Sequence, residues 1–366
     1  RKKIPSLPQT MVMRERKPNH PRKTFRHHRG EYLSPREEVF GGLPELFQGD
    51  QAAPSMNRLN LATWLMGPKN PLAARVEINR YWQAFFGQGL VRSPGDFGTQ
   101  SSPPSHPELL DFLAVQFREG GWSRKEVHRL IVTSATYRQS SRASTEDYSR
   151  DPENDLYSRG PRFRVDAEMV RDIVLKSAGK LSRKMYGPSV YPPQPASVTA
   201  IAYGSTPWKA AVGEDRYRRS LYTYSKRTAP FAAYQVFDSP TGENCIARRN
   251  RSNTPLQALT LLNDQMFLEL AQAMAVEILK SHPNQDPKTI AVAIFRQLVT
   301  RPPEETEIQD LLEFQKKQLQ RLLDGELVPN QIAGQVIPAN YKLQEVAAWV
   351  MLARAIMNID EVITKP

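Results

Sequence analysis

Apolar residues recur at intervals of three and four along most of the chain, which is the spacing of amphipathic helices. The clearest run covers residues 70–140, where three such segments are separated by turn residues. The second segment begins near Pro107, and Ser123 with Glu126 predicts a capping box for the third. The pattern therefore predicts a scaffold of three helices that encloses one polar loop.

Helical spacing returns after a polar linker that follows residue 140. One helix is expected from Asp166 to about Leu181, and the chain is again helical from Thr254 onward. A further helix start is predicted at Asp286, where the next residue is a proline. Arg354 stands among the apolar positions of the last helix, and we expect it to pair with a carboxylate.

Residues 187–250 interrupt this helical pattern, because proline, glycine and aromatic residues are frequent there. Residues 217–227 alternate in polarity and are rich in aromatic residues, which predicts the best strand of the chain. We therefore expect a mainly α fold, with a multi-helix, bundle-like body, an irregular β-containing insert and an extended N-terminal arm.

The predicted organisation has four parts within one compact unit. They are an extended basic arm at 1–55, a helical subdomain at 56–186, an aromatic-rich β insert at 187–250 and a C-terminal helical subdomain at 251–366.

Charge changes the picture only for the arm. The net charge is +12, yet residues 1–30 hold ten lysines and arginines and one acidic residue, while the remainder is nearly balanced. Such an arm could bind nucleic acid or an anionic surface. Alternatively it packs on the helical body against carboxylates of its own protein. Interspersed apolar residues favour packing, so nucleic acid is the least favoured partner. The arm residues expected to be buried are Val12, Met13, Phe25, Val39, Leu43, Leu46 and Phe47.

Several classes of function lack their sequence signatures. A single cysteine, Cys245, excludes an internal disulfide and a cysteine-based zinc site. There is no Cys-x-x-Cys-His for a c-type haem, no P-loop, no Gly-x-Ser-x-Gly and no His-Glu-x-x-His. No apolar run approaches the roughly 18 residues of a membrane span. We therefore expect no cofactor in this chain and no transmembrane segment.

Two groups of polar residues are candidates for a site. Asp96 and His106, with Glu108, could form an acid–base or metal pair, or else a turn and a helix cap. The second group precedes the helix start at Thr254, where arginines would bind a carboxylate or sulfate. The alternative is that this group ties the insert to the helix. Its members are Asp238, Arg248, Arg251 and Asn253.

Aromatic side chains of the insert offer a third possibility. Trp208, Tyr222 and Tyr224 are candidates for stacking on the faces of sugar rings. Aromatic residues also stabilise small sheets, so this feature alone does not decide between the two roles.

Four segments in fixed order carry a resemblance to a known family. They are NPLAARVEINRYWQAFFGQGLVRSPGDFG, GWSRKEVHRLIVTSATYRQSS, RRSLYTYSKRTAP and RSNTPLQALTLLND. Together they resemble planctomycete secreted domain one, a family of unknown function. The resemblance implies an extracytoplasmic location, in the periplasm, at the cell surface or secreted. It also implies a large exported protein with a second domain of unknown function upstream, often a c-type cytochrome domain, and in some members a lectin-like domain. It brings no catalytic residues.

These features favour a non-catalytic structural or assembly domain of an exported, cytochrome c-linked protein or complex. Its partners would be upstream domains or other chains of that complex, and haem c would lie in a partner or an upstream domain. The alternative is a part of an extracytoplasmic enzyme that acts on polysaccharide, for instance by oxidation, or a carbohydrate-binding module. The chain starts with Arg1 rather than methionine, which suggests a processed product or a piece of a longer polypeptide.

Overall fold

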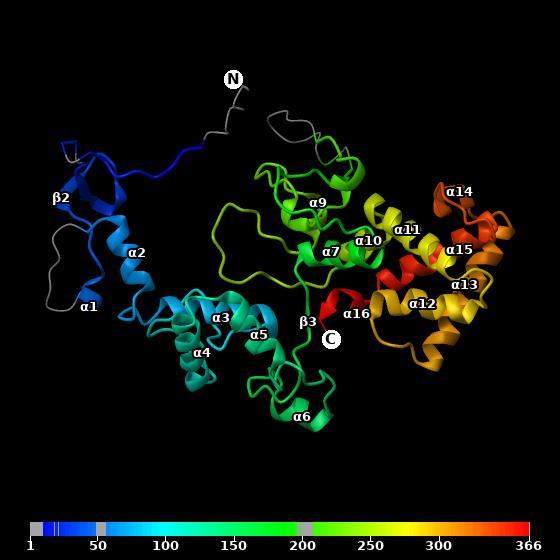
Figure 1. Ribbon diagram of the computed structural model, residues 1–366, viewed down its shortest axis with the longest axis horizontal. Coiled ribbons are helices and arrows are strands. Elements are labelled where there is room, and N and C mark those ends of the chain that lie inside the picture. The colour runs from blue at the N-terminus through cyan, green and yellow to red at the C-terminus, as the bar shows by residue number, and fades with distance from the viewer. Residues whose placement is uncertain are drawn as a thin grey trace, which may run out of the picture.

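The computed structural model describes residues 10–17, 19–20, 22–48, 56–195, 198 and 208–365. Within them the fold is mainly helical, as predicted, and the strands form two separate two-stranded antiparallel sheets. The arm projects from a first group of helices, and a thin connection joins that group to a larger C-terminal body (Figure 1). The remaining parts of the predicted arm, including residues 1–9 and 49–55, lie outside the described residues.

The arm forms a β-hairpin followed by two short helices. The elements are β1 (Thr24–His27), η1 (His28–Gly30), β2 (Pro35–Val39), α1 (Glu45–Gln48) and α2 (Arg58–Met66). Strand β1 pairs antiparallel with β2. The Asn57 side chain caps α2 by accepting a hydrogen bond from the Asn60 N–H at 2.9 Å. The ring of Phe47 lies 5.6 Å from that of Trp64, which connects α1 to α2.

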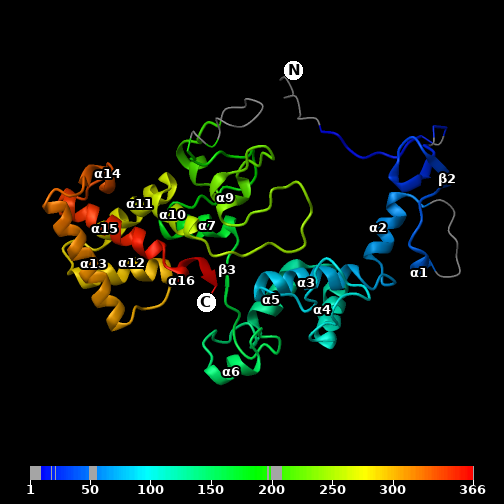
Figure 2. The same cartoon turned by 180° about the vertical axis from the view of Figure 1, so that it is seen from behind.

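The predicted burial of the arm's apolar residues is wrong for most of them. Val12, Met13 and Leu46 are 76%, 81% and 87% exposed, and Val39 is also exposed. Phe25, Leu43 and Phe47 are half-buried. The arm stands apart from the body in both opposite views (Figures 1 and 2). The physical reason is that its basic side chains find carboxylates locally. The pairs are Lys23 with Glu38, Arg26 with Glu37, and Glu15 with Arg58 of α2.

The N-terminal helical subdomain contains α3 (Ala73–Phe86), α4 (Pro107–Glu119), α5 (Arg124–Thr133) and α6 (Thr145–Arg150). Helix α4 packs against both α3 and α5, and the three helices share a hydrophobic core. The loop after α3 is held by Asn79, which is fully buried and exchanges two hydrogen bonds with the backbone of Val91. Ser123 does precede α5, but its side chain makes no capping hydrogen bond, so the predicted capping box is wrong.

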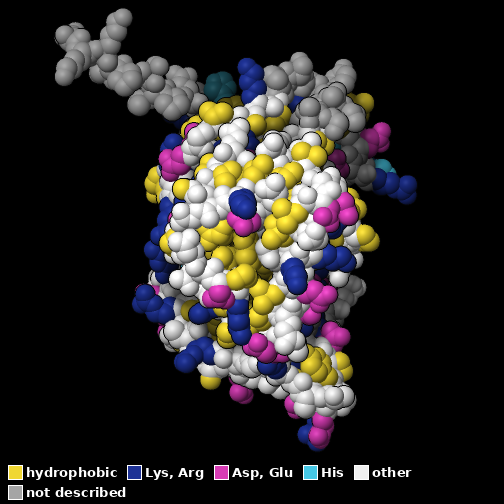
Figure 3. All heavy atoms as spheres, turned by 90° about the vertical axis from the view of Figure 1, so that its right-hand side faces the viewer, with side chains coloured by type: hydrophobic (Ala, Val, Ile, Leu, Met, Phe, Trp, Pro, Cys, Tyr) yellow, Lys and Arg dark blue, Asp and Glu magenta, His cyan; other side chains and the backbone are white. Residues whose placement is uncertain are grey.

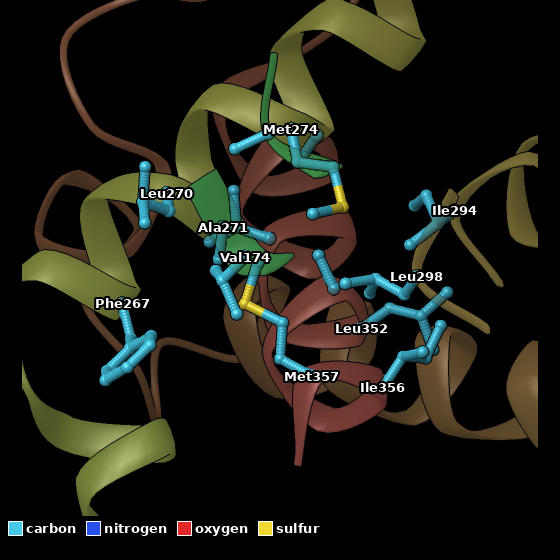
Figure 4. Packing of buried hydrophobic residues seen from close by; sticks show 14 of the residues in the cluster. Val174, Phe267, Leu270, Ala271, Met274, Ile294, Leu298, Leu352, Ile356 and Met357 are labelled. Carbon is cyan, nitrogen blue, oxygen red and sulfur yellow. The ribbon is translucent and has the colours of Figure 1, made fainter. Parts of the chain in front are cut away.

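The C-terminal body is built around one central helix. Its elements are α7 (Ala167–Ser177), α10 (Pro255–Asn263), α11 (Gln265–Ser281), α12 (Pro287–Val299), α13 (Glu305–Leu323), α14 (Pro329–Ala333), α15 (Leu343–Met357) and α16 (Asp360–Ile363). Helix α15 packs against the five helices from α10 to α14. Leu352, Ile356 and Met357 of α15 meet apolar side chains of α7, α11 and α12 (Figure 4). At the end formed by α13 and α14, hydrophobic side chains are visible between charged ones (Figure 3).

Local signals placed most starts of these helices correctly. Thr254 and Asp286 accept hydrogen bonds from the first-turn N–H groups of α10 and α12. Helix α7 ends at Ser177, earlier than predicted. Arg354 does not pair with a carboxylate, because it donates to the carbonyl oxygen of Leu262, at the end of α10. That carbonyl lacks a helical partner, so it accepts the guanidinium instead.

The insert is irregular, but the strand predicted at residues 217–227 is wrong. The chain there forms η2 (Gly213–Tyr217) and η3 (Ser220–Tyr222), with isolated bridges at Arg218 and Thr223, before α9 (Ala232–Val236). Two buried arginines explain the difference, because their guanidinium groups donate hydrogen bonds to backbone carbonyl oxygens of the insert. Arg171 of α7 donates to the carbonyl oxygens of Arg218 at 2.7 Å and Arg216 at 3.0 Å. The side chain of Arg218 donates to the carbonyl oxygen of Pro188 at 3.0 Å.

A second small sheet links the two helical parts. Strand β3 (Phe163–Arg164) connects them along the chain, and β4 (Thr364–Lys365) pairs with it antiparallel. In the described part of the chain, no helix is long and apolar enough to cross a membrane.

Candidate functional site

The two helical parts have separate hydrophobic cores, and the contacts between them are largely polar. Arg251, in the loop before α10, donates to the carbonyl oxygen of Gly87 at 3.1 Å. Lys365 of β4 donates to the carbonyl oxygen of Phe85 at 2.9 Å, and its Nζ lies 4.0 Å from the centre of the Tyr137 ring. The end of α3 is therefore the point where the C-terminal body meets the N-terminal subdomain.

A cavity of about 360 Å³, which we call the arginine pocket, lies at this junction. It is lined by the end of α3, the 148–163 segment and the loop before α10. Its charged lining consists of four arginines and one carboxylate: Arg159, Arg162, Arg248, Arg251 and Glu153. The aromatic lining consists of Phe86, Tyr148, Tyr157 and Phe163. The pocket thus combines excess positive charge with apolar ring surfaces.

Arg159 is the most buried charged group of the pocket, with 5% of its surface exposed. Its Nη2 donates to the carbonyl oxygen of Pro152 at 2.9 Å, and its guanidinium lies 4.3 Å from the centre of the Tyr148 ring. Its Nη1 is buried and has no hydrogen-bond partner. The backbone of Arg159 is fixed by the Asn154 side chain, which exchanges two hydrogen bonds with it. This guanidinium is therefore held in place with one donor group unused.

Arg251 contributes a second ordered guanidinium. Its guanidinium lies 4.2 Å from the centre of the Phe163 ring. The pKa of Arg251 is lowered, mainly by partial burial. The charge of Asp166 opposes this shift, and the neighbouring charge of Arg248 adds to it. Position 87 requires a glycine. Gly87 has a φ of +80°, and a Cβ there would lie 2.7 Å from the Phe163 side chain.

A second cavity of about 320 Å³ shares Arg248 and Arg251 with the arginine pocket. Arg249 lines this second cavity and is neutralised by Glu168, whose carboxylate lies 2.6 Å from its Nη1. Among the described residues, Arg248 and Arg251 form no ion pair with a carboxylate. Neither arginine is therefore neutralised by a direct ion pair, although the charge of Asp166, which also lines the second cavity, acts on Arg251.

The other members of this predicted group have different surroundings. Asp238 accepts hydrogen bonds from the backbone N–H of Ser252 at 2.7 Å and from its hydroxyl group. Asp238 thus ties the loop back onto the insert, which is the structural alternative expected from the sequence. Asn253 is exposed next to Ser252. The group is therefore divided between a pocket, which holds Arg248 and Arg251, and a structural tie.

Asp96 and His106 are not connected by any contact in the described residues. Asp96 is exposed and accepts a hydrogen bond from the Gly98 N–H at 2.7 Å, which forms a local turn. His106 precedes α4 without a capping hydrogen bond from its side chain, and its Nδ1 lies 3.1 Å from the Ser105 hydroxyl. The described part of the chain contains no group of three histidine, cysteine or acidic residues arranged to hold a metal ion.

Of the three aromatic candidates of the insert, Trp208 and Tyr224 share one aromatic cluster, with ring centres 6.4 Å apart, and Tyr222 lies in another environment. Trp208 stacks on Phe231 at 5.9 Å and donates to the carbonyl oxygen of Pro192 at 2.7 Å. The Tyr222 ring is covered by the guanidinium of Arg218, 3.7 Å from the ring centre. Tyr224 lines a cavity of about 390 Å³. That cavity, which we call the tyrosine cavity, is also lined by Phe231, Tyr234, Glu168 and Asp172.

In the described part of the chain, these observations define a mainly helical, two-core protein with an arginine-lined junction and without a recognised catalytic constellation. Residues 57–315 match the model of the family PSD1, described as a protein of unknown function (DUF1553). The match covers more than half of the chain, so the protein belongs to this family, which confirms the resemblance of its motifs. The match starts at the N-cap of α2 and ends within α13. No curated protein and no solved structure matches the chain.

Sequence reasoning missed Arg159, Arg162 and Lys365. The first two lie between the polar linker and the helix expected from Asp166, in a stretch for which no element or role was predicted. A signal was present, since three arginines occur within the short run SRGPRFR next to aromatic residues. Lys365 carries no such signal, because its partners are separated from it by more than 200 residues of chain.

Proposed function

We propose that this protein is a non-catalytic assembly domain of an exported, cytochrome c-linked protein or complex. The observation that carries the proposal is the exposed apolar surface of the arm and α2. Leu33, Phe40 and Leu59 are 84%, 74% and 73% exposed, and α2 has no buried residue. Single exposed apolar residues are normal, but such a concentration is typical of a protein-binding surface.

The charge of the arm indicates the chemistry of the partner. The arm is strongly basic, and only part of its charge is neutralised by local carboxylates. A partner that buries it would present acidic residues around an apolar surface, because complementary charge guides association and burial of apolar area stabilises the complex. In this proposal the partner is an upstream domain or another chain of the same complex, and haem c is bound there. The family resemblance supports the cytochrome link and the extracytoplasmic location.

The test uses the protein in its native cells. We would isolate it with its associated chains, identify these by mass spectrometry, and record their haem absorbance. The assembly variant replaces Leu33, Phe40 and Leu59 with serine. The control replaces Leu323 and Val336, two exposed apolar residues of the C-terminal body, with serine in the same way. We expect the wild type and the control to retain an acidic, haem-containing partner that the assembly variant loses. Equal retention by all three proteins would refute the proposal.

Hydrogen exchange distinguishes a specific interface from loose association. In the isolated complex, the amides of β1, β2 and α2 should exchange more slowly than in the free chain, since burial by a partner protects their hydrogen bonds. Unchanged exchange across these elements would show that any retained partner binds elsewhere.

A second candidate function, carbohydrate binding, is supported by the tyrosine cavity. Aromatic side chains and carboxylates converge there, and the volume of about 390 Å³ suits a small ligand. Titration calorimetry with a panel of neutral oligosaccharides tests this role. Tyr224→Ala should weaken binding about tenfold, from the loss of a stacking ring. The matched control is Tyr186→Ala, which removes a ring that is 80% exposed and outside the cavity. Absence of binding by the wild type would exclude this candidate.

A further inference from the structure

We propose that the arginine pocket binds a tetrahedral dianion, a phosphate or sulfate group, at the junction of the two helical parts. This inference is independent of the assembly role, because no residue of the arm takes part. It assigns the pocket a ligand that would contact Arg248 and Arg251 and lie beside the buried Arg159. Guanidinium groups suit such a ligand because they present several donors in a planar fork to its oxygens.

Uncompensated charge is the first observation that supports an anionic ligand. Four arginines line the pocket with a single carboxylate, Glu153. Arg162 has a long ion pair of 3.6 Å with Asp360, whereas Arg248 and Arg251 have none in the described part of the chain. Like charges that are gathered in a partly buried site repel one another, and an anion between them removes that repulsion.

The buried guanidinium of Arg159 is the second and independent observation. Its Nη1 has neither solvent contact nor a hydrogen-bond partner, which is unusual for a buried charged donor. The rest of the side chain is satisfied by Pro152 and by the Tyr148 ring. A buried charged donor without a hydrogen-bond partner is unfavourable. The charge of the exposed Asp147 acts on Arg159 without a direct ion pair, so a negative group in the pocket would compensate this cation further.

The pocket is also built before a ligand arrives. Asp151 fixes the preceding turn by accepting hydrogen bonds from the backbone N–H groups of Asp155 and Leu156. Asn154 then fixes the backbone of Arg159. A preorganised site loses little conformational freedom when it binds, which favours affinity. The volume of about 360 Å³ lies within the range of about 300–1,000 Å³ that is typical of ligand pockets.

The volume leaves room for more than the anion, and the aromatic lining could contact a ring attached to it. The dianion can therefore be a free ion or a group on a larger molecule such as a phosphorylated sugar. Titration calorimetry on the full chain separates these sources. The probes are inorganic phosphate, inorganic sulfate and glucose 6-phosphate, each at constant ionic strength in chloride. Tighter binding of the sugar phosphate would identify an attached group, and equal binding of all three would identify the free ion.

Variants of the loop arginines test the site itself. Arg248→Gln and Arg251→Gln should each weaken binding about tenfold, because each removes a charge-assisted contact. Arg248 is the cleaner variant, since both arginines are exposed but, within the described residues, only Arg251 donates a hydrogen bond, to the Gly87 carbonyl oxygen. The control is Arg129→Gln, an exposed arginine on α5 that is not part of the pocket lining. We expect the control to bind within about twofold of the wild type.

Two results would overturn the proposal. One is the absence of saturable binding of any probe to the wild type at millimolar concentrations. The other is binding that Arg248→Gln and Arg129→Gln weaken equally, since this would indicate a general effect of net charge. An increase in thermal stability with phosphate that is lost in Arg248→Gln would be a second supporting readout, because a ligand that binds the folded state stabilises it.

Discussion

The buried guanidinium of Arg171 provides the sharpest test of how the insert is held. Arg171 is 1% exposed and donates to the carbonyl oxygens of Arg218 and Arg216 and, at 3.3 Å, to the Ser220 hydroxyl. Burial lowers its pKa, and it forms no ion pair within the described residues. The proposed substitution is Arg171→Met, which keeps the apolar stem but removes these three hydrogen bonds and a fourth, from Nε to the Met266 sulfur at 3.3 Å.

The expected loss can be worked out from these contacts. A hydrogen bond to a charged group contributes about 1.5–3 kcal/mol, and the two carbonyl contacts are short. The substitution also leaves these carbonyls unpaired, but it relieves the cost of burying a charge, which offsets part of the loss. We therefore expect the free energy of unfolding to fall by about 3 kcal/mol, a large part of a typical total of about 5–15 kcal/mol.

Urea denaturation followed by circular dichroism measures this change. Hydrogen exchange should in addition show faster exchange in η2 and η3 than elsewhere, since these turns lose their anchor. The control is Arg219→Met, which removes a neighbouring exposed arginine with a single long ion pair of 3.8 Å to Asp172. The control should change stability by less than about 0.5 kcal/mol. The reasoning is refuted if Arg171→Met costs no more than this control.

Three further substitutions test other parts of the structure. Gly87→Ala should lower the melting temperature more than Gly121→Ala, because both residues have positive φ but only at Gly87 does a Cβ clash; equal effects would contradict the close packing. The hydrogen bonds from Arg301 lower the pKa of Glu307 to about 2 from 4.5, so their stabilisation is present above pH 4.5 and is lost as the pH falls toward 2. Glu307→Gln should remove this acid dependence, worth about 1 kcal/mol given its partial exposure, in denaturation curves measured across that range. Burial lowers the pKa of Lys365 to about 8 from 10.5, so the unfolded chain binds more protons between these values and stability should rise with pH there; Lys365→Met should abolish the rise, and a rise that persists would assign it to another group.

Sequence pattern was a good guide to the helices because their signals are local. Thr254, Asp264 and Asp286 each cap the helix that follows. The insert could not be predicted in the same way. Alternation at residues 217–227 suggested a strand, but the hydrogen-bond partners of this backbone come from Arg171, on a distant helix. A periodic sequence pattern does not show which distant side chain will donate a hydrogen bond to a given backbone carbonyl oxygen.

The candidate site was likewise predictable only where its signals are local in the sequence. Arg248 and Arg251 were recognisable because they are clustered immediately before a helix start. Arg159 was not, because its importance depends on burial against Tyr148 and on contacts within its loop. Asp96 was a candidate acid because His106 and Glu108 follow it in the sequence. Its carboxylate instead accepts a hydrogen bond within a local turn. Short polar motifs therefore indicated part of the arginine pocket, whereas tertiary contacts completed it.

The separation of the two cores has a consequence for synthesis on the ribosome. The buried residues of the first core lie within 74–131, and Tyr137 and Tyr157 pack against them, so this core can close soon after residue 157 has emerged. The second core is centred on α15, and until α15 emerges the apolar faces of α11 and α12 lack the packing that this helix supplies. At a translation rate of about 5–20 residues per second, this exposure lasts for several seconds. The nascent chain is therefore most vulnerable to aggregation late in its production, when its first half is already folded.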